Sequence, residues 1–109
     1  MAVGDAPVME ALLDINAVSV ERTELDPRSL MLVRLAALVA VDAPVSSYLL
    51  HAGPSADVGL TAADAQDVLV AVAPIVGTPR TASAAAKMVE ALDLAIELAI
   101  EDAESAQDG

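Results

Sequence analysis

The chain has 109 residues, with 17 acidic and 5 basic side chains, a formal net charge of −12 and no cysteine. Contacts to nucleic acid or to an anionic membrane surface need clustered Lys and Arg, so this charge argues against both as partners. The missing cysteine excludes disulfides, thiolate metal sites and thiol catalysis.

Length and pattern predict a single domain over residues 1–109, with a short N-terminal helix at 7–15 and a core at 26–104. The first ten residues carry acidic but no basic side chains, so we predict no signal peptide. The longest apolar runs, residues 30–41 and 68–76, are too short to span a bilayer. We therefore expect a cytoplasmic protein, and we predict no cofactor and no metal.

The first helix is predicted to be short and to be followed by a linker. Within residues 7–15, Leu12 and Ile15 lie on one apolar face. Asn16 is a plausible stop, and residues 17–25 show no clear period. We therefore predict a linker between Asn16 and the core.

The central helix is predicted from about Pro27 to Val41, with Asp26 as its N-cap and Pro in the first helical position. From Leu30 to Val41 every residue except Arg34 is apolar. A helix apolar nearly all round is buried on nearly all sides, by other helices or by a second subunit. Arg34 then either pairs with an acid of another helix or subunit, or anchors the carboxylate of a substrate.

The next helix, predicted at residues 44–52, carries the polar side chains most suited to chemistry. Ser47, Tyr48 and His51 lie at helical spacing, and they include the only His and the only aromatic residue of the chain. The Gly-Pro pair at residues 53–54 is expected to end or kink this helix.

Two further helices complete the chain. Thr61 and Asp64 resemble a capping box at the start of a helix that runs to about Ile75. Residues 77–79, Gly-Thr-Pro, form a compact joint, and the last helix is predicted at about 79–104. Its carboxylates could in principle bind a cation, but a solvated outer face is the simpler interpretation. The apolar stripe of this helix consists of Met88, Leu92, Ala95, Ile96 and Ala99. Its acidic face consists of Glu90, Asp93, Glu97, Glu101 and Glu104.

Two segments carry a family resemblance: LDPRSLMLVRLAALVAVDAPVSSYLLHAG, and then VGLTAADAQDVLVAVAPIVGTPRTASAAAKMVEAL. The most telling features are a His eight residues before Gly59, the Gly-Leu-Thr turn and the Gly-x-Pro joint. Over roughly residues 25–92 this pattern resembles the carboxymuconolactone decarboxylase family, which includes alkyl hydroperoxidase D-like proteins. The resemblance implies an all-α, five-helix orthogonal bundle whose subunits form trimers or hexamers, with active sites near subunit contacts.

The peroxidase branch of that family resembles this chain but carries Cys-x-x-Cys, a His four residues after the second Cys, and a Glu twelve residues before the first. Laid on this sequence, His51 matches the His. Pro44 and Ser47 stand at the two Cys positions, and Leu32 stands at the Glu position. Because serine cannot replace a redox thiol, peroxide reduction through a disulfide is excluded.

The decarboxylase branch does not use the thiol pair, and its resemblance implies a small carboxylated substrate. His51 would then be the catalytic acid or base, since histidine titrates near neutral pH, with Ser47 as the second catalytic candidate. Tyr48 and Arg34 would bind the substrate, and Arg80 is a further candidate for its carboxylate. Pro54 departs from the family pattern and bears on the position of His51.

Two functions remain open from the sequence. One is a carboxy-lyase-type enzyme without a cofactor; the other is a non-catalytic member that serves as an oligomeric scaffold or as a binding module for a small molecule or protein. The high apolar share favours a homo-oligomer, because obligate interfaces resemble a core cut in half. A tightly packed monomer with scattered exposed alanines is the alternative.

Overall fold

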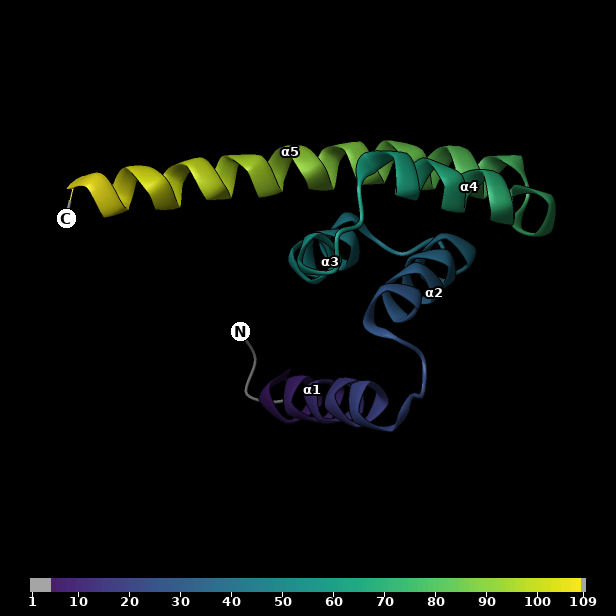
Figure 1. Ribbon diagram of the computed structural model, residues 1–109, viewed down its shortest axis with the longest axis horizontal. Coiled ribbons are helices and arrows are strands. Elements are labelled where there is room, and N and C mark those ends of the chain that lie inside the picture. Colours follow the sequence, from purple (N-terminus) through teal and green to yellow (C-terminus); the bar gives the residue numbers. More distant parts are fainter. Residues whose placement is uncertain (1–4, 109) are drawn as a thin grey trace.

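The computed structural model describes residues 5–108, which form five helices and no strand (Figure 1). α5 runs across the view while α3 is seen along its axis, so these two helices cross at a large angle. The all-α prediction is therefore confirmed. Within the described residues, no helix has both the length and the apolar content needed to cross a membrane. The helices are α1 (Asp5–Arg22), α2 (Pro27–Ala40), α3 (Val45–Asp57), α4 (Ala62–Val76) and α5 (Thr78–Asp108).

The start of α2 follows the predicted cap. The Asp26 carboxylate accepts a hydrogen bond from the backbone N–H of Ser29 at 2.8 Å, and Pro27 is the first helical residue. This backbone bond, helped by the Ser29 hydroxyl, lowers the pKa of Asp26, because both donors favour the charged carboxylate. The cap fixes where the central helix enters the bundle.

The joints on either side of α4 also match their predictions. Thr61 and Asp64 form a reciprocal capping box, in which the Thr61 hydroxyl accepts from the Asp64 N–H and the Asp64 carboxylate accepts from the Thr61 N–H. At the other end Gly77 has φ of 90°, which an L side chain rarely adopts, so glycine suits this C-cap. α5 starts at the next residue.

The prediction for the N-terminal region was wrong. α1 does not stop at Asn16 but continues to Arg22, so most of the predicted linker at residues 17–25 is helical. Val18 and Val20 have only slightly reduced helix propensity, and a helix once started gains one hydrogen bond for each added residue. A polar residue such as Asn16 therefore does not end the helix by itself.

Gly53 and Pro54 were expected to end or kink the helix, and the first of these two outcomes was wrong. α3 continues to Asp57, with Pro54 inside it. Proline removes one backbone hydrogen bond, here the one to the carbonyl of Leu50, and this costs about 3 kcal/mol in a helix interior. Leu50 is 74% exposed, so this part of α3 lies at the surface, where water can take the place of the missing donor.

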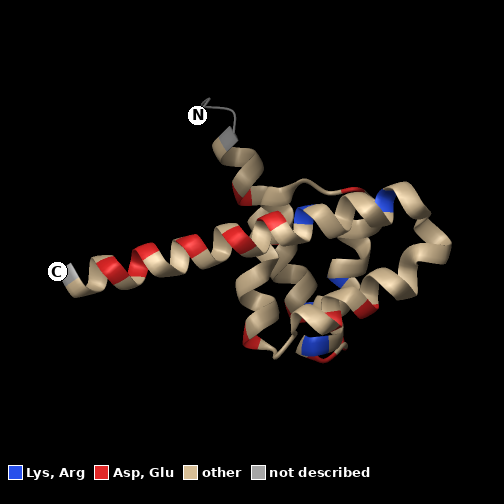
Figure 2. Cartoon of the chain, turned by 90° about the horizontal axis from the view of Figure 1, so that it is seen from above, with Lys and Arg blue, Asp and Glu red and all other residues tan. Residues whose placement is uncertain are grey.

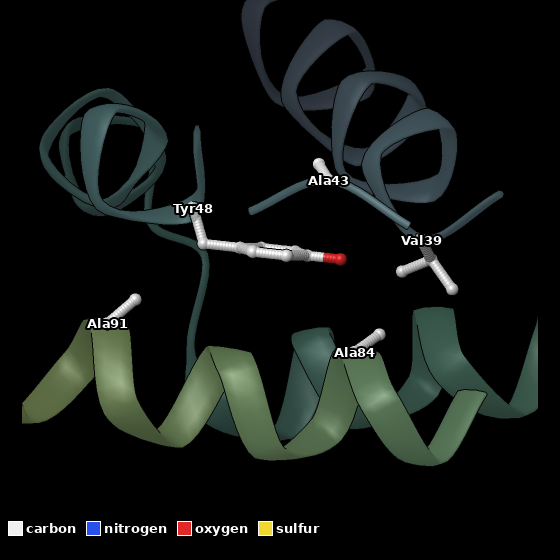
Figure 3. Close-up of a cluster of buried hydrophobic side chains, with 5 residues drawn as sticks. All are labelled: Val39, Ala43, Tyr48, Ala84 and Ala91. Atoms are coloured by element: carbon white, nitrogen blue, oxygen red, sulfur yellow. The ribbon is translucent and has the colours of Figure 1, made fainter. Parts of the chain in front are cut away.

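The core lies between α2, α3 and α5 (Figure 3). The Tyr48 ring extends between the small residues of α5 and the end of α2. The fully buried helix expected at residues 27–41 is not seen in the single chain, because Val33 is 54% exposed and Val41 is 70% exposed. α2 is exposed at Pro27, Arg28, Val33 and Ala37 and is half-buried or buried at its other positions. The buried cluster consists of Val39, Ala43, Tyr48, Ala84 and Ala91.

Two parts of the chain stand outside this packing. α1 lies apart from the other four helices in Figure 1, and α5 projects beyond them in Figure 2. Their large apolar side chains are exposed, as Leu13 at 63% and Ile100 at 52% illustrate. The molecule is thus a four-helix bundle with one loosely attached helix and one projecting helix end.

Candidate functional site

His51 lines two cavities whose other lining residues are all different. The first, which we call the α1 cavity, is a hollow that is largely open to solvent, with a volume of about 310 Å³ and a lining of side chains from α1, α2 and α3. The second, which we call the bundle cavity, has a volume of about 350 Å³ and is lined by α2, α3, α4, α5 and the segment before α4. His51 lines both. His51 is the one residue that the linings of these two spaces share.

One hydrogen bond determines which ring nitrogen of His51 carries the proton. Nδ1 lies 2.7 Å from the carbonyl oxygen of Ser47, one turn earlier in α3. A carbonyl can only accept, so Nδ1 is the donor and carries a proton. In the neutral ring Nε2 then bears the lone pair, and it makes no hydrogen bond within residues 5–108. Nε2 is thus the atom that can accept or donate a proton at a ligand.

Arg34 lines the α1 cavity together with His51. Its guanidinium donates to the Asn16 side-chain oxygen at 2.6 Å and to the Ser19 hydroxyl at 3.0 Å, both on α1. Both partners are neutral. Among the described residues the ion pairs involve Arg28 and Lys87 instead, so the charge of Arg34 has no carboxylate partner there.

Tyr48 contributes its ring, and not its hydroxyl, to the lining of the bundle cavity. The ring lines the bundle cavity, while the hydroxyl points toward Val39 in Figure 3. That hydroxyl is buried and has no hydrogen-bond partner in the part of the chain that the structure describes. Burial raises the pKa of Tyr48, and the negative charge of Asp42 raises it further. Tyr48 is therefore an apolar wall of the cavity and a core residue at once.

The other two candidates lie off the cavities. Ser47 is half-buried and lines neither of them, and it reaches the site only through the carbonyl that holds His51. Arg80 donates a hydrogen bond to the carbonyl of Ala40, at the C-terminal end of α2, and lines neither cavity. A cation at that helix end is stabilised by the helix dipole. His51 thus shares the lining of the α1 cavity with Arg34 and the lining of the bundle cavity with Tyr48.

Sequence reasoning missed the two residues that hold Arg34. Asn16 was predicted as a helix stop and Ser19 as part of a linker. In the structure both lie on α1, on the face that carries Leu12 and Ile15 toward the α1 cavity. Two polar residues three positions apart within an apolar helical face were the available signal, because such a pair needs a polar partner on the facing helix.

The acidic face of α5 offers no metal site. Figure 2 shows its carboxylates recurring along the projecting part of the helix. Within residues 5–108 there is no group of three or more His, Cys, Asp or Glu arranged to hold a metal ion. This arrangement suits a solvated helix face.

The comparisons with known proteins identify the family. The model of the carboxymuconolactone decarboxylase family matches residues 6–91, which include all of α2, α3 and α4 and the whole of both cavity linings except Leu92. No curated protein and no solved structure matches the chain. The match spans more than half of the sequence. The chain therefore belongs to the carboxymuconolactone decarboxylase family.

Proposed function

We propose that this chain binds a small carboxylated molecule in the α1 cavity and acts on it as a carboxy-lyase-type enzyme without a cofactor. The observation that carries the proposal is the shared lining: Arg34 and His51 face one cavity of about 310 Å³. This places a cation without a carboxylate partner in the described chain beside the only imidazole. A carboxylate bound to Arg34 lies next to a group that can carry a proton.

Arg34 would hold the carboxylate. Its planar guanidinium carries several N–H donors, and the two hydrogen bonds to Asn16 and Ser19 leave others for a ligand. Those two bonds also fix the orientation of the guanidinium. Because the chain has a net charge of −12, long-range attraction does not bring an anion to the site, and a local cation is needed.

His51 would carry the proton. In a decarboxylation the bond to the carboxyl carbon breaks, CO₂ leaves, and the electron pair remains on the substrate carbon, which takes a proton from Nε2 of the charged ring. Solvent then returns a proton to Nε2. The Ser47 carbonyl keeps Nδ1 protonated throughout, so Ser47 is a positioning residue.

The test is turnover of 4-carboxymuconolactone, followed as CO₂ release. The proposal predicts release that His51→Ala abolishes and that Arg34→Gln reduces mainly through a raised KM. Arg22→Gln is the matched control, because it removes the same charge from the exposed end of α1 and leaves the cavity intact. Absence of turnover together with absence of binding would overturn the proposal.

A second candidate function is a non-catalytic homo-oligomer, and a specific observation favours it. The large apolar residues of α1 are 48% to 65% exposed, and those of the projecting half of α5 are 37% to 52% exposed. Contiguous apolar surface of this kind is typical of subunit interfaces. Light scattering tests it: a trimer or hexamer is expected, while a monomer at micromolar concentration would exclude it. An oligomer that also turns over the lactone would support the enzyme and would exclude the non-catalytic function.

A further inference from the structure

We infer that the ligand of this protein is an amphiphilic carboxylate, whose charged head binds at Arg34 in the α1 cavity and whose apolar body occupies the bundle cavity. The inference rests on the proposed function, since it takes the Arg34 site as given and adds the class of molecule that fills it. The structural basis is the juxtaposition of one cationic and one apolar cavity at His51.

The bundle cavity is free of charge in a highly charged chain. None of its lining side chains is Asp, Glu, Lys or Arg, although the chain has 17 acidic residues. Most of the lining is Ala, Leu, Val or Met, with the Tyr48 ring as one wall. The polar exceptions are His51, Ser55, Thr61 and Gln66. A cavity of this character binds an apolar body and has no charged side chain that could pair with a second charged group.

The two cavities are complementary in what they offer. The α1 cavity supplies the Arg34 charge and three further polar side chains. The bundle cavity supplies apolar surface on four helices. Both are lined by the same residue, His51, so the proton carrier lies where the head and the body of such a ligand join.

The size of the bundle cavity sets the length of the apolar body. Its volume of about 350 Å³ corresponds to roughly ten to twelve units of about 30 Å³, the volume of one water molecule in the liquid. Because a methylene group is about as large as a water molecule, the bundle cavity can hold a body of up to about ten carbon atoms. A carboxylate with a very short chain would fill the head site alone.

The experiment is a chain-length series. Calorimetry would measure the Kd of butanoate, hexanoate and octanoate, with octanol as a ligand that has the apolar body and no charge. The inference predicts a Kd that falls about fourfold for each added methylene, because each buried methylene contributes a fixed increment of hydrophobic free energy. Octanol should bind more weakly than octanoate. Tyr48 is the only aromatic residue, so its fluorescence should change with octanoate and not with butanoate.

The variants separate the two cavities. Ala65→Leu places a larger side chain in the bundle cavity and should flatten the chain-length dependence, while leaving the Kd of butanoate unchanged. Ala71→Leu is the matched control, because Ala71 is exposed on the same helix and lines neither cavity. Arg34→Gln should weaken all three carboxylates by the same factor.

The possible failures are distinguishable. If all three carboxylates bind with equal Kd, the bundle cavity is not used and the inference fails, while the Arg34 site stands. If none of them binds, the proposed function fails as well. If octanol binds as tightly as octanoate, or if Ala71→Leu flattens the series as Ala65→Leu does, the joint site is wrong. The series on the unaltered protein decides the question even where a variant does not fold.

Discussion

The bundle around Tyr48 and the helix α1 are both α-helical, but different forces hold them. In the bundle, Val39 is fully buried and Ala84 and Ala91 are almost so. In α1, no large apolar side chain is buried, and the contact to α2 includes two hydrogen bonds from Arg34. Hydrophobic burial stabilises the bundle, whereas α1 depends on polar contacts that are worth about 1 kcal/mol each.

This difference matters because the candidate site lies on the boundary between the two regions. Arg34 extends from the bundle to α1, and His51 belongs to the bundle. A ligand that binds Arg34 would therefore add contacts where the chain itself supplies few. Sites are commonly built from such less stable regions, since they must open to admit a ligand.

The largest expected effect is a difference in hydrogen exchange between the two regions. Amides of α1 should exchange through local opening that costs little free energy. Amides in the middle of α5 should exchange only through global unfolding, so the two should differ by roughly 5 kcal/mol. Mass spectrometry of peptides from residues 6–22 and 80–92 measures this. Equal protection would show that α1 is packed as firmly as the bundle, and the comparison would fail.

The next effect is the loss of stability when the largest side chain of the buried cluster is removed. Tyr48→Ala should lower the free energy of unfolding by about 3–5 kcal/mol, because it removes the one large ring of the buried cluster. Leu13→Ala, on the exposed side of α1, should change it by less than about 0.5 kcal/mol. Urea denaturation of both variants checks this. A larger loss for Leu13→Ala would indicate that α1 is buried against a second subunit.

A smaller effect should appear when only the hydroxyl of Tyr48 is removed. Tyr48→Phe keeps the ring and deletes a buried group without a hydrogen-bond partner within residues 5–108. The free energy of unfolding should therefore rise, by about 1 kcal/mol, because an unsatisfied buried hydroxyl is costly. Urea denaturation again measures it. A loss of stability would contradict the account and would mean that the hydroxyl has a partner.

The smallest effect is in the pH dependence. Lys87 and Ser83 donate to the Asp42 carboxylate and lower the pKa of Asp42 below 3.8. The unfolded chain then binds the proton more readily, so Asp42 stabilises the fold above about pH 4 and this contribution is lost as the pH falls through the lowered pKa. Asp42→Asn removes it and keeps the left-handed backbone at φ of 53°, which Asn tolerates. The urea midpoints of the two proteins should converge on acidification; a constant gap would contradict this.

The sequence predicted the fold well where local chemistry decides it. The caps at Asp26 and Thr61 and the joint at Gly77 depend on residues close in the chain, and all three are as expected. It failed where the outcome depends on the surroundings. Asn16 disfavours a helix only slightly and Pro54 disfavours it strongly, yet both lie inside helices. Whether a helix ends at such a residue depends on cooperativity and on access of water to the backbone.

The candidate site was predictable in part. The sequence identified His51 and Arg34 from their rarity in apolar helices, and the structure places both on one cavity. It did not show that Tyr48 lines the site with its ring and not with its hydroxyl. It also did not show that Ser47 contributes its backbone carbonyl and not its hydroxyl. Those distinctions depend on where a side chain points, which is set by packing between helices far apart in the sequence.

The most direct test of the central claim, that Arg34 and His51 share a carboxylate site, is a proton NMR titration of the His51 ring with acetate. His51 is the only histidine, so its Cε1–H signal needs no assignment. We predict a shift that saturates with acetate, persists in Arg22→Gln and disappears in Arg34→Gln. A signal that does not move, or that moves equally in Arg34→Gln, would contradict the account.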